Sequence, residues 1–252
     1  MPGSIPLWLD HASIAVPELA DAVAHLDDRL GLRATVSPAT PERHSRVYLD
    51  RGYLEVAARP GDTGWTASLF FLRFDDPEAL RGHLEAVGLA YRFGAYEGVD
   101  GTWDDVEIDA GEVPLPILVR RTAPAEIAQD WPPALPAPHR CGARTLAQVH
   151  VGVPSLEPAI EAYERLLGLE AAPATTVDPR SGRSRATLPA ASGEVVLLDA
   201  GTGEIERIVL GVGSLEKART ALGERLTIDP PDPVAWLDPA DAFGLELGFV
   251  EA

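Results

Sequence analysis

The chain has 252 residues, of which 46% are apolar and 24% are charged, so it is long enough for two globular domains that each bury a core. Its formal net charge of −18 argues against binding to nucleic acid or to an anionic membrane, which both require a cationic surface. The single cysteine, Cys141, excludes an intramolecular disulfide and a cysteine-based metal cluster.

The sequence contains no apolar run of the roughly 20 residues that span a bilayer. Residues 1–4 are not followed by the basic and apolar stretches of a signal peptide. We therefore expect a cytoplasmic protein without a membrane partner.

The first predicted elements in chain order are a strand and a helix. Residues 9–16 alternate as a strand does, Pro17 and Glu18 open an amphipathic helix, and the helix ends before Leu30-Gly31-Leu32. Three short strand candidates follow at residues 33–36, 46–50 and 53–57. Together they make one βαβββ module.

Three further copies of this module follow along the chain. Their first strands are predicted at residues 68–74, 146–153 and 207–212, each leading into a helix that ends near a glycine. Each helix is again followed by about three strand candidates. This internal repeat predicts an α+β fold of four βαβββ modules.

A proline-rich segment separates the second module from the third. Its prolines exclude a helix or an inner strand, and they are Pro124, Pro132, Pro133, Pro136 and Pro138. We therefore predict an N-terminal domain at residues 1–122, a linker at 123–142 and a C-terminal domain at 143–252, with two modules in each domain.

The amino-acid sequence of the modules resembles that of the vicinal-oxygen-chelate superfamily, which includes glyoxalases, bleomycin-resistance proteins and ring-cleaving dioxygenases. The resemblance is carried by Val16-Pro17-Glu18-Leu19 after a histidine-bearing strand, by its repeat Val153-Pro154-Ser155-Leu156, and by Gly52-Tyr53-Leu54-Glu55. It is greatest for the two-domain glyoxalase-like group, in which a strand like 115–118 leads into a proline-rich linker. It implies paired modules that curl around a cleft for a small molecule.

The resemblance also implies metal ligands on the first and fourth strands of each module. In the first module these positions match His11 and Glu55, which both suit a divalent cation. The other modules match Leu69 with Leu118, Gln148 with Val196, and Arg207 with Gly248. Of these only glutamine serves as a ligand in glyoxalases, so we expect no extradiol dioxygenase of the usual two-domain kind and a C-terminal domain without the family metal site.

Side chains two apart on a strand share a face, which predicts the neighbours of His11 and Glu55 in the N-terminal cleft. The expected substrate-binding residues are Ser13, Arg46, Tyr48, Tyr53, Arg73, Trp103, Asp105 and Glu107. His44 is a candidate third ligand at the rim, whereas His25, His83 and His139 are expected to be solvated.

The same parity predicts a second cleft in the C-terminal domain, lined by Gln148, His150, Arg185 and Arg207. Its two arginines are suited to hold a carboxylate or phosphate of a ligand. The alternative is that Arg207 only pairs with Glu246 across the sheet.

Three interpretations of His11 and Glu55 stay open. They bind a divalent metal, completed by Asp105, Glu107 or water, that polarises a substrate oxygen. Or they act without a metal as general base and acid on a substrate anchored by Arg46 and Tyr48. Or the cleft only binds a ligand, or the pair is merely a satisfied hydrogen-bonded contact.

The function that the resemblance implies is that of a small-molecule enzyme, of isomerase or lyase type, acting next to a carbonyl in the N-terminal cleft. The alternative is a non-catalytic drug- or metabolite-binding protein like the bleomycin-resistance proteins. Beyond one divalent metal no cofactor is expected. The only partner expected is a small molecule, and the chain is compatible with a monomer or a homodimer.

Overall fold

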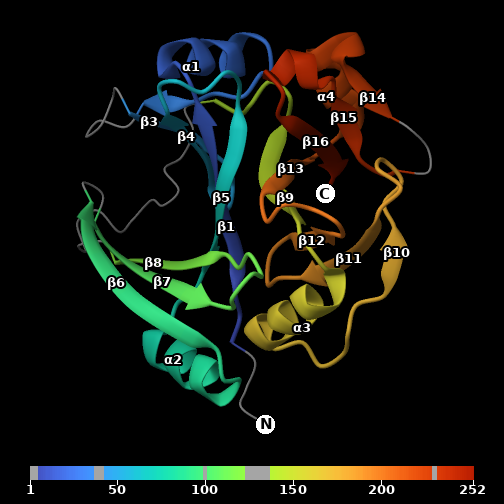
Figure 1. Cartoon of the computed structure of the whole chain (residues 1–252). Coiled ribbons are helices and arrows are strands. Elements are labelled where there is room, and N and C mark those ends of the chain that lie inside the picture. The colour runs from blue at the N-terminus through green and yellow to red at the C-terminus, as the bar shows by residue number, and fades with distance from the viewer. Residues whose placement is uncertain (1–4, 37–42, 99–100, 123–136, 229–231) are drawn as a thin grey trace. The chain divides into compact units, whose positions relative to one another are not determined.

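A computed structural model of the chain describes residues 5–36, 43–98, 101–122, 137–228 and 232–252 (Figure 1). Strand, helix and three strands follow one another four times in it, which confirms the four predicted βαβββ modules. The first module is β1 (Trp8–Val16), α1 (Leu19–Asp28), β2 (Thr35–Val36), β3 (His44–Tyr48) and β4 (Tyr53–Ala58). The second is β5 (Thr66–Arg73), α2 (Pro77–Ala86), β6 (Ala90–Gly98), β7 (Gly101–Asp109) and β8 (Ile117–Thr122).

The third module is β9 (Ala143–Gly152), α3 (Leu156–Leu167), β10 (Thr175–Val177), β11 (Ser184–Pro189) and β12 (Glu194–Leu198). The fourth is β13 (Ile205–Val212), α4 (Leu215–Leu222), β14 (Leu226–Ile228), β15 (Ala235–Leu237) and β16 (Glu246–Glu251). Two short 3-10 helices, η1 (Gly223–Arg225) and η2 (Pro239–Ala242), also belong to it.

The helices begin and end where local chemistry directs. Asp76 precedes α2, and its Oδ1 accepts hydrogen bonds from the backbone N–H groups of Glu78 and Ala79 at 2.9 and 3.0 Å, so two free donors of the first turn are satisfied. Gly168 ends α3 in the left-handed conformation, with φ at 65°, which glycine adopts without strain.

Each half of the chain forms one sheet with the same strand order. The first sheet runs β2-β3-β4-β1-β5-β8-β7-β6 and the second runs β10-β11-β12-β9-β13-β16-β15-β14. The first strand of a module lies parallel to its fourth, as β1 does to β4 and β13 to β16. In this order the first and fourth strands of each module are neighbours near the middle of the sheet. The outer strands pair with them in antiparallel fashion, as β3 does with β4 and β15 with β16.

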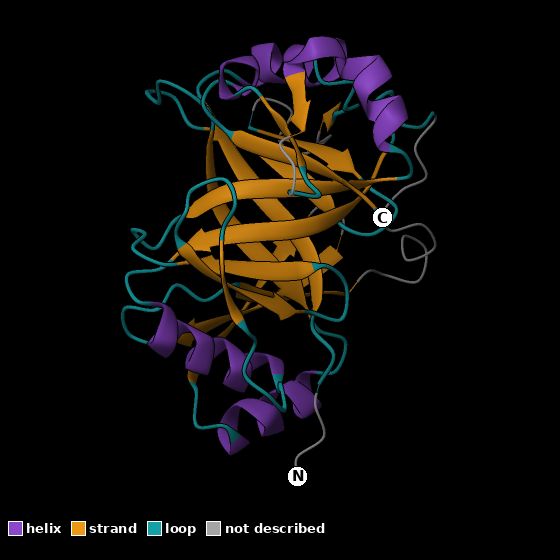
Figure 2. Cartoon of the chain, turned by 90° about the vertical axis from the view of Figure 1, so that its right-hand side faces the viewer, coloured by secondary structure: helices purple, strands orange, loops and turns teal. Residues whose placement is uncertain are grey.

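Contacts divide the chain into two compact units that each combine a module from either half. Unit 1 comprises residues 1–10, 70–131 and 150–204, and unit 2 comprises 11–69, 132–149 and 205–252. Strand dominates the regular structure of both, and each has two of the described α-helices (Figure 2). The predicted domain boundaries stay a prediction, and most of the predicted linker lies outside the described residues.

Within unit 1, the second and third modules meet through their helices. The Nε2 atom of His83 on α2 donates to the carbonyl of Leu166 on α3 at 2.9 Å, and Tyr163 donates to the carbonyl of Pro114 at 2.7 Å. Within unit 2, the first and fourth modules meet where Arg225 contacts the carbonyl of Arg29 and where His25 bonds to the carbonyl of Asp241 at 2.6 Å.

None of the described helices has the length and hydropathy needed to cross a membrane.

Candidate functional site

Three neighbouring strands of unit 2 bring the predicted site residues of the first module together. In the parallel pairing of β1 with β4, His11 lies opposite Tyr53 and Ser13 lies opposite Glu55. In the antiparallel pairing of β3 with β4, Arg46 lies opposite Glu55 and Tyr48 opposite Tyr53. Paired residues point to the same side of a sheet. One face therefore carries His11, Ser13, Arg46, Tyr48, Tyr53 and Glu55, and we call it the His11 face.

Burial separates the members of the His11 face into two groups. The side chains of His11, Ser13, Tyr48 and Tyr53 are all buried. Arg46 and Glu55 are half-buried. The groups of this face that solvent or a ligand can reach are therefore mainly a guanidinium and a carboxylate.

Tyr53 is the centre of the aromatic contacts on this face. The imidazole of His11 stacks on its ring, with centroids 4.3 Å apart and an interplanar angle of 11°. The guanidinium carbon of Arg46 lies 5.2 Å from the centroid of the same ring, within the range of a cation–π contact. Arg46 also donates from Nη1 to the hydroxyl of Tyr48 at 3.5 Å. These contacts place the guanidinium over the ring of Tyr53 and against the hydroxyl of Tyr48.

The carboxylate of Glu55 is oriented by Ser13. The Oγ atom of Ser13 donates to Glu55 Oε2 at 2.7 Å, a short charge-assisted bond. His11 lies on the same face and stacks on Tyr53, the residue two positions before Glu55. The three interpretations of His11 and Glu55 therefore stay open.

The remaining residues predicted for the N-terminal cleft belong to unit 1. Arg73 lies over the ring of Trp8, with its guanidinium carbon 5.0 Å from the centroid. Trp103 is buried and stacks on Tyr96. Glu107 pairs with Arg92 at 2.5 Å on the exposed surface.

Asp105 in unit 1 packs against Gly94 on the paired strand β6. A Cβ atom on Gly94 would lie 2.6 Å from Asp105 Oδ1, so a side chain at this position would displace the carboxylate of Asp105. Asp105 and Glu107 are thus placed by contacts within their own hairpin.

Both arginines predicted for the second cleft have acidic partners. Arg207 is 4% exposed, and its Nε lies 2.6 Å from Glu246 Oε2, directly across from it in the sheet. Arg185 lies 3.6 Å from the buried carboxylate of Asp178. The pairing of Arg207 with Glu246 is the alternative that the sequence left open. Of the other two residues, His150 is buried and Gln148 is half-buried.

The fourth module has filled the position that matches Glu55. Val209 lies opposite Gly248 in the register, as Ser13 lies opposite Glu55. A Cβ on Gly248 would lie 2.6 Å from Val234 Cγ1 and 2.9 Å from the ring of Trp236. The indole therefore covers this backbone, and its Nε1 donates to the buried Asp232 at 2.8 Å. In the fourth module the positions that match the metal ligands His11 and Glu55 are Arg207 and Gly248. At Gly248 the space that a ligand side chain would need is occupied by Trp236 and Val234.

Three histidines that we expected to be solvated are held by the fold, so that expectation is wrong. His139 and His83 are buried, and His25 bonds to the carbonyl of Asp241. The ring of His139 bonds to the backbone of Tyr48, a residue of the His11 face. Sequence reasoning missed this residue because it lies next to the proline-rich segment, where nothing in the pattern indicates burial.

The described side chains contain no group of three or more His, Cys, Asp and Glu that could hold a metal ion. His11 and Glu55 are possible donors on the His11 face, and His44 lies on the same side of β3 as Arg46.

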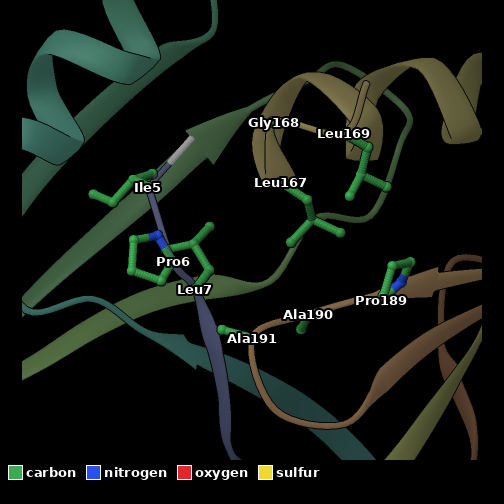
Figure 3. Close-up of a pocket in the computed structure, with 9 residues that line it drawn as sticks. All are labelled: Ile5, Pro6, Leu7, Leu167, Gly168, Leu169, Pro189, Ala190 and Ala191. Carbon is green, nitrogen blue, oxygen red and sulfur yellow. The ribbon is translucent and has the colours of Figure 1, made fainter. Parts of the chain in front are cut away.

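A pocket of about 450 Å³ lies in unit 1, and none of these polar residues lines it (Figure 3). Its lining residues are Ile5, Pro6, Leu7, Leu167, Gly168, Leu169, Pro189, Ala190 and Ala191. The lining offers no ionisable side chain, so it cannot supply acid–base chemistry. The His11 face is the better candidate for a reactive site.

Comparison with known proteins gives matches of two kinds. A family model described as a glyoxalase-like domain matches residues 9–167. No curated protein matches the sequence.

Among solved structures, a variant of homoprotocatechuate 2,3-dioxygenase from Brevibacterium fuscum is similar with a TM-score of 0.65 and 12% identity, over 99% of this chain and 72% of that one. A second variant of that enzyme gives a TM-score of 0.64 and 13% identity, over 100% and 73%. The enzyme of the same name from Arthrobacter globiformis gives 0.62 and 14%, over 99% and 82%. At such identities the likeness shows the fold alone.

Proposed function

The chain belongs to the glyoxalase-like domain family, and from that premise we propose that it is an enzyme that moves a proton at a carbon next to a carbonyl in a small molecule. The family membership and the likeness to extradiol dioxygenases confirm the resemblance to the vicinal-oxygen-chelate superfamily. The isomerase or lyase type of reaction and its location on the His11 face are our proposal.

One observation carries this proposal, the arrangement of Glu55. Its half-buried carboxylate has one oxygen fixed by Ser13 and lies across the strand pair from Arg46. A carboxylate oriented by a hydrogen bond is a suitable general base. The guanidinium of Arg46, the residue paired with Glu55 in the sheet, is suited to stabilise negative charge that develops on an oxygen.

The residues of the His11 face divide the reaction between them. Glu55 removes a proton from the carbon, and the electron pair of that C–H bond moves toward the carbonyl oxygen. Arg46 and the hydroxyl of Tyr48 bind that oxygen while it carries the charge. Glu55 or His11 then returns a proton to the product, at the same carbon or at a neighbouring atom. Tyr53 keeps Arg46 and His11 in place through the contacts of its ring.

The superfamily also implies a divalent metal, which His11 and Glu55 would bind. A catalytic metal centre usually has three protein ligands, whereas the described residues bring together no third His, Cys, Asp or Glu. The position matching Glu55 in the fourth module is occupied by the packing of Trp236 against Gly248. The donor set therefore does not fit such a centre, and no step of the proposed reaction passes through a metal.

Solvent exchange measures the proposed proton transfer without knowledge of the natural substrate. We would incubate the protein in D2O with a panel of small carbonyl compounds bearing a hydrogen on the adjacent carbon and follow the loss of that proton by NMR. We expect accelerated exchange for at least one class of compound. The Glu55→Gln variant should catalyse the exchange at least about 100-fold more slowly, which is the usual contribution of a general base.

The matched control is Glu85→Gln. Glu85 is an exposed residue of α2 that accepts a hydrogen bond from the hydroxyl of Tyr91 at 2.9 Å. The same change of charge at Glu85 should leave the rate of exchange unchanged. Equal rates in the wild-type protein and Glu55→Gln would refute the role of Glu55. Exchange that disappears with a chelator and returns with a divalent cation would replace the proposal by the metal-assisted one.

The same panel distinguishes the alternative of a non-catalytic binding protein. Buried Tyr48 and Tyr53 give the His11 face an aromatic component that would also suit a bound drug or metabolite. Saturable binding of a panel compound without exchange in the wild-type protein would favour that alternative.

A further inference from the structure

We propose that His139, four residues before the start of β9, is a positioning residue for the His11 face and holds strand β3 in place through the backbone of Tyr48. The proposal rests on the function proposed above only for its consequence in catalysis. The structural part stands on the contacts of His139 itself.

Both ring nitrogens of His139 bond to the backbone of the first module. Its Nδ1 accepts a hydrogen bond from the N–H of Arg33 at 2.9 Å, just before β2. Because Nδ1 must therefore be an acceptor, the ring hydrogen lies on Nε2, which donates to the carbonyl of Tyr48 at 2.7 Å. The imidazole thus joins the start of β2 to the end of β3.

The segment around His139 is fastened to the same module by further bonds. Arg140 donates from its backbone N–H to the carbonyl of Gly31 at 2.9 Å, and Gly142 closes a turn onto the carbonyl of His139 at 2.9 Å. Gly31 has φ at 64°, and a Cβ there would lie 3.0 Å from the backbone nitrogen of Cys141. A side chain at position 31 would therefore push the segment away.

Strand β3 is the element that this segment holds. It carries Arg46 and Tyr48, and within the described residues its outer neighbour β2 pairs with it at Thr35 with Arg46 and Val36 with Ser45. His139 bonds just before β2 and at the end of β3, so it contacts both strands of this pair. The bond from His139 to Tyr48 supplies a fixed point at the end of β3, two residues from Arg46.

Protonation of His139 would break this arrangement, since a hydrogen on Nδ1 would face the N–H of Arg33. Burial lowers the pKa of His139 and the charge of Arg33 lowers it further, whereas the bond to Tyr48 and the carboxylates of Asp50 and Asp27 oppose the shift. The neutral form is therefore held at neutral pH, and acid releases it.

Two substitutions separate the two bonds. In His139→Gln the amide nitrogen replaces Nε2 and can still donate to Tyr48, whereas in His139→Asn the amide oxygen replaces Nδ1 and can accept only from Arg33. We expect His139→Asn to raise the KM for exchange by about two- to tenfold, the range one hydrogen bond is worth, with a smaller change in kcat. His139→Gln should stay near the wild-type KM.

A second measurement does not depend on activity. The chain has five tyrosines, so 3-fluorotyrosine labelling gives few fluorine resonances, and Tyr48→Phe assigns the one of interest. We expect the Tyr48 resonance to shift as acid protonates His139 in the wild-type protein. It should not follow that titration in either variant, and at neutral pH it should be displaced in His139→Asn.

The control is His83→Gln, which alters another buried histidine bound to a backbone carbonyl, that of Leu166. It should lose stability without changing KM or the Tyr48 resonance. The proposal is overturned if His139→Asn leaves both readouts as in the wild type, if both His139 variants raise KM equally, or if His83→Gln raises it too. A wild-type protein without exchange activity would refute the proposed function, and the fluorine resonance would still decide the role of His139.

Discussion

Gly248 offers a direct test of the packing in the fourth module. A Cβ added there would approach Val234 Cγ1 to 2.6 Å and two ring atoms of Trp236 to 2.9 Å. Carbon atoms in contact normally lie about 3.5–4.0 Å apart. Gly248→Ala therefore requires both neighbours to move by roughly 1 Å in a fully buried cluster with Val209. Overpacking of this kind costs about 1–3 kcal/mol.

The comparison variant is Gly82→Ala in α2. A Cβ there would meet nothing within 4 Å, and the residue is exposed in the interior of a helix. Alanine is favoured over glycine by about 0.5–1 kcal/mol in such a position. The same substitution is thus expected to destabilise at 248 and to stabilise at 82.

Urea unfolding followed by tryptophan fluorescence measures both free energies of unfolding. A change of midpoint at constant slope would report a change of stability, whereas a changed slope would indicate altered compactness. Because the chain has two compact units, circular dichroism should be followed in parallel to test whether a single transition describes both. Gly248→Ala as stable as the wild type would show that Trp236 does not fill the position that matches Glu55.

Further predictions follow from the buried ionisable groups. Glu246→Gln leaves Arg207, 4% exposed, without its carboxylate, and since Glu246 is itself 32% exposed we expect a loss of about 1–3 kcal/mol in urea unfolding. If Glu246→Gln lowered the free energy of unfolding no more than Glu85→Gln does at an exposed position, this expectation would be contradicted. For His139, the native pKa is below the ordinary value of 6.5, so the unfolded chain binds the proton first. Its contribution to stability is therefore complete above about pH 6.5 and decreases as the pH falls from there toward the native pKa. The pH profile of unfolding should lose this component in His139→Gln, and identical profiles would count against it. Burial raises the pKa of Cys141 to about 11, so native protein at pH 7–8 should react with a thiol reagent far more slowly than unfolded protein. Equal rates in the two states would show that the thiol is accessible.

The four modules could be predicted because their information is local. Alternation along a strand, a proline at a helix start and a glycine at its end recur in each copy, and none depends on distant contacts. Strand ends were less well predicted. Strand β6 extends to Gly98 because its pairing with β7 continues through Gly98 opposite Gly101. Gly94 and Ala95 interrupt the apolar alternation there.

Local parity also groups the residues of the His11 face, since it places Ser13 on the side of His11 and Tyr53 on the side of Glu55, whereas their role in a site stays a prediction. Parity does not give the register between strands, so it could not show that Glu55 lies opposite Ser13. The contact of His139 with Tyr48 joins residues 91 positions apart, and no sequence pattern of a single chain specifies such a pair. In the sequence, the glycine at position 248, where the first module has Glu55, is the feature that indicates another side chain beside this backbone, and in the structure that side chain is Trp236.

The two compact units have a consequence for dissecting the protein by truncation. Each unit takes residues from both sides of the proline-rich segment, and α2 is bonded to α3 just as the end of α1 is bonded to the start of β14 through Arg29 and Arg225. A cut in that segment would therefore leave two fragments that each hold half of both units. Such fragments would expose the apolar surfaces by which the modules of one half pack against those of the other within each unit, and co-expression should restore a folded complex that neither half forms alone. The chain would then behave as a split protein, whose halves report on their own association.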